Sequence, residues 1–114
     1  MSSALVICTS CADGQGQALL EAVENEALAR DWALPVRGQA CMAACKQSCT
    51  AALQGPGKHS YLFGQLMPDA TCVDALLAVA AQHAEPGDGL LAWGRRPERL
   101  KSGLVARLPP LAGA

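Results

Sequence analysis

The chain has few aromatic residues, no surplus of basic residues and no long apolar run. Only 4% of its 114 residues are Phe, Trp or Tyr, and 9 Lys and Arg stand against 10 Asp and Glu. Nucleic-acid binding needs a basic surface and, for single strands, aromatic rings on which bases stack, so nucleic acid is not an expected partner. A membrane span needs about 20 apolar residues, and a secretory signal needs a basic start before its apolar stretch. Neither pattern occurs, so we expect a cytoplasmic protein that does not contact membranes.

Six cysteines are the most unusual feature of the composition. A chain of this length forms one domain, residues 1–114, and its hydrophobic content of 51% is enough for a compact core. Disulfides are rare in the reducing cytoplasm. The cysteines therefore indicate metal binding or redox chemistry rather than a disulfide framework.

Apolar patterning predicts an α/β domain with elements in the order β-α-β-β-β-α. Strands are expected at 4–7, 34–40, 50–53 and 58–66, because these short apolar runs end at Gly, Pro or polar loops. Helices are expected over 15–31 and from about 71 to 84, the second with Thr71 and Asp74 at capping-box spacing. This order favours a mixed sheet with helices packed on it. From about residue 88 the sequence becomes a basic tail containing several prolines.

The cysteines fall into two groups, each at the end of an expected strand. Cys8 and Cys11 follow the first strand, and Cys41, Cys45 and Cys49 follow the second. In a β-α-β unit the two strands are parallel, so their carboxyl ends lie at the same edge of the sheet. The two groups are therefore expected to meet in space and to form a thiol-rich site.

Thiolates are soft ligands that select zinc, Cu(I) or an iron–sulfur cluster. A structural zinc site usually shows two C-x2-C pairs, whereas the second group here is C-x3-C-x3-C. The Ser-, Thr-, Gly- and Ala-rich loops suit a [2Fe–2S] cluster, whose sulfides accept backbone hydrogen bonds. Two alternatives stay open: a mononuclear zinc or cobalt site, and a thiol–disulfide oxidoreductase that uses Cys8 and Cys11. The second leaves the later cysteine group unexplained.

The chain resembles two groups of known proteins. The element order, the cysteines after the first strand and the segment 41–45 look like a thioredoxin-like [2Fe–2S] ferredoxin, a fold that also occurs in respiratory complex I. Over nearly its whole length the chain resembles DUF1636, a family described as predicted metal-binding. The stretches that carry this resemblance are 6–11, 41–53, 57–64 and 89–93, together with Arg96-Pro97 and 107–110.

These resemblances imply a thioredoxin-like fold and a soluble electron carrier rather than an enzyme. They imply a [2Fe–2S] cluster held by Cys8, Cys11, Cys41 and Cys45, with Cys49 as the reserve ligand if Cys11 is not one. They also imply a homodimer, a redox partner protein and a link to cobalamin metabolism.

The remaining metal-binding side chains are expected to have other roles. Cys72 stands alone on the second helix, and a lone cysteine is usually a small buried residue. His59 and His83 are expected to lie far from the cysteine loops, in solvent-facing or hairpin positions, so ligation of a Rieske type is not expected.

Overall fold

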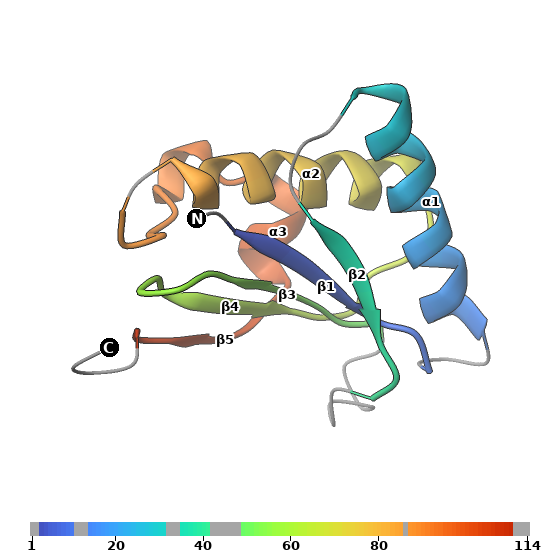
Figure 1. Cartoon of the computed structure of the whole chain (residues 1–114), viewed down its shortest axis with the longest axis horizontal. Coiled ribbons are helices and arrows are strands. Elements are labelled where there is room, and N and C mark those ends of the chain that lie inside the picture. The colour runs from blue at the N-terminus through green and yellow to red at the C-terminus, as the bar shows by residue number, and fades with distance from the viewer. Residues whose placement is uncertain (1–2, 11–13, 32–34, 42–48, 86, 111–114) are drawn as a thin grey trace.

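The computed structural model describes residues 3–10, 14–31, 35–41, 49–85 and 87–110, which form a sheet with helices packed against it (Figure 1). The elements are β1 (Ala4–Cys8), α1 (Gln15–Ala29), β2 (Val36–Gln39), β3 (Ala51–Gln54), β4 (Ser60–Phe63), α2 (Ala70–Ala84), the 3-10 helix η3 (Trp93–Arg95), α3 (Glu98–Ser102) and β5 (Leu104–Leu108). The predicted order β-α-β-β-β-α is confirmed as far as α2.

The five strands form one mixed sheet in the order β2-β1-β3-β4-β5. β1 and β2 are parallel, with Cys8 opposite Gln39, and the other neighbouring strands are antiparallel. The predicted parallel pairing of the first two strands is therefore confirmed. The carboxyl ends of both strands lie at one end of the sheet, where β3 begins at Ala51. We call this end, which carries Cys8, Gln39 and Ala51, the cysteine end.

Helix α1 connects the two parallel strands. It begins after Gly14, whose φ of 96° is a conformation that glycine adopts without steric cost. Leu19, Leu20, Val23 and Ala27 recur at helical spacing and are buried. This stripe packs on β1 and β2 and also meets α2, so the helix holds the cysteine-bearing strands together from one side.

Helix α2 begins one residue earlier than predicted and has a different cap. The carboxylate of Asp69 accepts a hydrogen bond of 2.9 Å from the backbone N–H of Cys72. The predicted capping residue, Thr71, instead lies inside the first turn. Asp is among the strongest N-cap residues, and it stands at the point where the chain leaves its extended conformation. Within the described ranges, no helix combines the length and apolar character that crossing a bilayer requires.

The two faces of the sheet differ in burial. The strand residues that face the helices are fully buried: Leu5, Ile7, Ala51, Leu53, Tyr61 and Phe63. The alternating residues form the other face, where Val6, Ala52 and Leu62 lie in one row across three strands. Ala52 and Leu62 are only partly covered. The core therefore lies on the helix side, as expected for a two-layer α/β fold.

The residues that the sequence predicts as a basic tail complete the fold. Leu100 of α3 is fully buried in the core, and β5 pairs antiparallel with β4, with Leu108 opposite Ser60. Pro97 immediately precedes α3, and Pro109 follows β5. The prolines thus mark the ends of short elements, positions at which the missing N–H and fixed φ are tolerated.

Candidate metal centre

Cys8 is the last residue of β1, and its side chain is buried. Its backbone N–H donates a 3.0 Å hydrogen bond to the carbonyl of Thr50, just before β3, and on its other side it lies opposite Gln39 of β2. Its Sγ lies 3.8 Å from Oγ of Ser10. Cys8 is therefore held in the middle of the cysteine end, between two neighbouring strands.

Cys41 lies two residues beyond the end of β2 and is exposed. The chain leaving β1 is tied to the same place, because Thr9 donates hydrogen bonds from its N–H and its hydroxyl to the carbonyl of Gln39, at 2.9 and 3.3 Å. Gly38 permits this approach, since a Cβ there would lie 2.6 Å from Cγ2 of Thr9. The segments that lead from Cys8 and to Cys41 therefore run side by side.

Cys49 reaches the same end of the sheet from the opposite side of β1. It exchanges two backbone hydrogen bonds with Leu66, of 3.0 and 3.4 Å, and its side chain is buried. The carbonyl of the next residue, Thr50, accepts a hydrogen bond from the N–H of Cys8, so Cys49 lies on the β3 side of Cys8. Cys49, the reserve ligand, therefore lies at the same end of the sheet as Cys8.

Cys8, at the end of β1, Cys41, two residues after β2, and Cys49, two residues before β3, therefore lie toward the same end of the sheet. Cys11 and Cys45 lie outside the described residues. Within the described ranges, no three Cys, His, Asp or Glu side chains stand close enough together to hold a metal ion. The donor chemistry nevertheless fits a thiolate-bound iron–sulfur centre. Of these three cysteines, Cys8 and Cys49 are buried and Cys41 is exposed.

Cys72 has a local role in the first turn of α2. It is buried, and its Sγ accepts a 3.4 Å hydrogen bond from the backbone N–H of Met67. Its own N–H is bound by Asp69. The expectation that Cys72 is a buried packing residue agrees with this placement.

Another cluster of polar side chains lies at the opposite end of the sheet, where β1 begins. His83 is fully buried, and its Nε2 lies 2.6 Å from the carbonyl of His59. Burial lowers the pKa of His83 below its ordinary value of 6.5, and the charge of Lys58 adds to this, while the hydrogen bond to His59 acts in the opposite direction. Both histidines lie far from Cys8, as expected. The complete burial of His83 differs from the solvent-facing or hairpin position that the sequence predicts.

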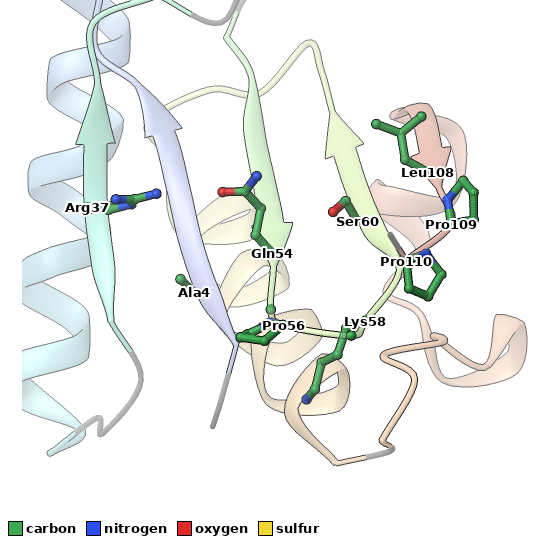
Figure 2. Close-up of a pocket in the computed structure, with 11 residues that line it drawn as sticks. Ala4, Arg37, Gln54, Pro56, Lys58, Ser60, Leu108, Pro109 and Pro110 are labelled. Atoms are coloured by element: carbon green, nitrogen blue, oxygen red, sulfur yellow. The ribbon is translucent and has the colours of Figure 1, made fainter. Parts of the chain in front are cut away.

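A hollow of about 800 Å³ opens over the uncovered face at that same far end (Figure 2). Arg37 extends from β2 toward β1, and Gln54, Ser60 and Leu108 line the other side. Lys58 borders the hollow with its stem, but its amine points away and bonds to the end of α2. No acid–base or nucleophile–base pair lines the hollow among the described residues, so the chemistry of the chain is better sought at the cysteine end.

The described fold is thioredoxin-like. It is similar to the structure of a thioredoxin-like [2Fe–2S] ferredoxin from Aquifex aeolicus, with a TM-score of 0.63 over 96% of this chain and 94% of that one. The two sequences are only 13% identical, so the likeness establishes the fold. A family model described as "Protein of unknown function (DUF1636)" matches residues 5–110, and the chain belongs to that family. No curated protein matches the sequence.

Proposed function

We propose that the protein is a one-electron carrier with a [2Fe–2S] cluster held by Cys8, Cys11, Cys41 and Cys45. The observation that carries the proposal is the parallel pairing of β1 and β2, with Cys8 opposite Gln39. This pairing places Cys8 beside the end of β2, two residues before Cys41, and so supports a meeting of the two cysteine groups. The similar fold of a protein whose title names a [2Fe–2S] cluster supports the choice of cofactor.

A bound [2Fe–2S] cluster takes up and releases a single electron. The chain's own contribution is the arrangement of its thiols. The backbone hydrogen bond from Cys8 to Thr50 fixes one ligand in the interior, and Cys41 presents another at the surface. A partner protein can therefore approach the centre without entering a substrate cavity.

The test is the visible spectrum of protein purified without oxygen, together with its iron and sulfide content. We expect a reddish-brown protein with about two iron and two sulfide per chain. Cys8→Ser and Cys41→Ser should each abolish the colour. Cys72→Ser is the matched control, since that thiol accepts a hydrogen bond from the N–H of Met67, just before α2, and it should keep the colour.

Other outcomes would replace the proposal with a specific alternative. A colourless protein with one zinc or cobalt per chain would indicate a mononuclear site. A metal-free protein that cycles a disulfide between Cys8 and Cys11 would indicate a thiol–disulfide oxidoreductase.

Three further parts of the proposal rest on the resemblance to thioredoxin-like ferredoxins and to the DUF1636 family. We propose a homodimer, which light scattering of the purified protein tests directly. We propose a cytoplasmic location, where the thiols stay reduced before metal loading.

We also propose that the electrons serve corrinoid chemistry, so that the reduced protein should convert one cob(III)alamin to cob(II)alamin per electron it gives up.

A further inference from the structure

The charges of the chain are divided between opposite edges of the sheet. After Gly89 the sequence carries five basic residues and one acidic residue, although the whole chain has a net charge of -1. These residues belong to η3, α3 and β5, beside the β5 edge. Helix α1, which packs on β1 and β2, carries Glu21, Glu24 and Glu26 and no basic residue. Arg95 is paired with Glu85 and Lys101 lies 3.8 Å from Glu98, and Arg30 after α1 is paired with Glu26, so the two sides differ in their balance of charge. We call the β5 side, with its excess of basic residues, the basic edge and the α1 side the acidic edge.

Trp93 stands on the basic edge with 61% of its surface exposed. Its ring lies 5.2 Å from the guanidinium carbon of Arg96 and 5.1 Å from the amine of Lys101. Arg96 also stacks on Tyr61, at 5.6 Å, and is buried. Cation–π contacts to a buried arginine hold the indole in place while leaving it accessible. Tryptophan and arginine are the residues most enriched at the energetic centres of protein interfaces.

Two parts of the basic edge meet different ends of the sheet: η3 is tied to the end of α2 through Arg95 and Glu85, whereas the end of α3 adjoins the cysteine end. The N–H of Gly64 donates to the carbonyl of Gly103 at 2.8 Å, and Arg99 donates to the carbonyl of Gln65. The residue after Gln65 is Leu66, which exchanges its backbone hydrogen bonds with Cys49. Helix α3 is therefore tied to the segment that pairs with a cysteine of the candidate metal centre.

A depression of about 250 Å³ lies in the same region. It is lined by Gln65, Ser102, Gly103, Leu104 and Val105. Val105 is 40% exposed and occupies the irregularity in the register between β4 and β5. The lining of the depression is mainly polar, with Val105 as an exposed apolar side chain, and it lies between α3 and the end of the sheet that carries the cysteines.

We propose that Trp93, Lys101 and the depression beside Val105 form a docking surface for the acidic face of a redox partner protein. The inference rests on the proposed electron-transfer function and specifies the partner's chemistry. Opposite charges steer such partners together and raise association rates, an effect that salt weakens. Trp93 supplies the apolar anchor, and α3 directs the partner toward the thiols. A protein partner fits better than a nucleic acid, because strand-binding surfaces stack several bases on several rings, whereas here one exposed ring stands between two cations.

The first experiment measures electron transfer from reduced flavodoxin, a small acidic flavoprotein that serves as the probe. One electron leaves its flavin and reduces the oxidised protein, and stopped-flow absorbance follows the rate across a range of ionic strengths. We expect the wild-type rate to fall with salt. Lys101→Glu and Trp93→Ala should each slow the reaction at low salt, the charge reversal by roughly tenfold.

The matched control is Arg37→Glu, which makes the same charge change on β2 at the opposite edge of the sheet. It should alter the rate by less than about twofold, because steering depends on where the charge lies. Equal effects of the Arg37 and Lys101 variants would overturn the proposal, and so would a rate that does not depend on salt.

The second experiment needs no cluster, so it separates failure of the docking surface from failure of the proposed function. In a Trp32→Phe background, Trp93 is the sole tryptophan. Its emission is expected to shift to the blue when a glutamate-rich, tryptophan-free peptide is added at low salt, and the shift should disappear with Lys101→Glu. A colourless protein that shows this shift would end the ferredoxin proposal and keep the docking surface. A coloured protein without the shift would end only the docking surface, and so would tighter binding of a single-stranded oligonucleotide of equal charge.

Discussion

The hydroxyl oxygen of Ser3 lies 2.5 Å from Nδ1 of His83, across 80 positions of sequence. The groups around this pair determine which atom donates in each of its hydrogen bonds. A carbonyl only accepts, so Nε2 of His83 carries the proton that His59 receives. Nδ1 of the neutral ring then accepts from Ser3. The amine of Lys58, 3.4 Å from the Ser3 oxygen, only donates, so Ser3 accepts from it.

We predict that the protein loses stability in acid through His83. Its pKa is lowered by burial in the folded chain and returns toward 6.5 on unfolding. As the pH falls below about 6.5, the unfolded chain binds a proton that the folded chain resists, so the free energy of unfolding decreases by up to about 1.4 kcal/mol per pH unit. Above about pH 6.5 the contribution of His83 to the free energy of unfolding is fully present. Urea midpoints at about pH 5 and pH 7.5 measure the change, following the linear dependence of stability on denaturant.

The control for this prediction separates the two histidines. His83→Gln should remove much of the difference between the two pH values, whereas His59→Gln should retain it, because the hydrogen bond between the His59 ring and the carbonyl of Asp88 is exposed. Equal pH dependence in both variants would contradict the assignment.

Lys58→Met should destabilise the protein by about 1–3 kcal/mol, the typical cost of leaving buried acceptors unsatisfied. The amine of Lys58 donates to the carbonyls of His83 and Ala84 at the end of α2, at 2.9 and 3.2 Å. Thermal unfolding measures the loss. Lys101→Met changes the same charge on α3 and should cost less than about 1 kcal/mol, since its 3.8 Å ion pair is with the solvent-exposed Glu98 and such pairs contribute little. A cost of the same size in both variants would show that the buried contacts do not stabilise the fold.

Alanine substitutions at two glycines with positive φ separate the free-energy cost of a steric clash from the cost of the backbone conformation. Gly57 has a φ of 70° and open space around it, whereas Gly89 has a φ of 73° and a Cβ there would lie 2.8 Å from Nε2 of His83. Gly57→Ala should cost about 1–2 kcal/mol from the left-handed backbone alone. Gly89→Ala should cost about 1–3 kcal/mol more, because it also overpacks the site. Equal urea midpoints for the two variants would contradict the packing around His83.

The ligand set can be decided among the remaining cysteines. We predict that Cys11→Ser and Cys45→Ser each lose the cluster and that Cys49→Ser keeps it with a shifted reduction potential, because hydrogen bonds and thiols near a cluster tune its potential. Iron content and a redox titration with visible spectroscopy provide the measurement. Loss of iron in Cys49→Ser, with iron retained in Cys11→Ser, would reverse the two assignments.

The part of the site that could be predicted from the sequence is the part set by short-range patterns. The apolar run 4–7, the helical stripe of α1 and the following strand define a β-α-β unit, and the handedness and pairing rules for such units place Cys8 beside the end of β2. No long-range information was needed for this step.

What the sequence did not reveal depends on register between distant segments. Ser3 becomes a buried donor only because β1 begins beside the end of α2, and nothing local marks the pair with His83. Strand β5 was missed for a different reason: it lies near three prolines, most of its residues are exposed, and its pairing with β4 is interrupted near Leu62. Such edge strands depend on tertiary contacts rather than on intrinsic preference.

The central place of β1 has a consequence for synthesis of the protein on the ribosome. β1 is made first but pairs with β2 and β3, which emerge later, and Ser3 meets its partner only after residue 83 has been made. Contacts of such large sequence separation form slowly. The strands on both sides of Cys8 are therefore complete only after β3 has been translated, so we expect its thiol to become buried late in synthesis.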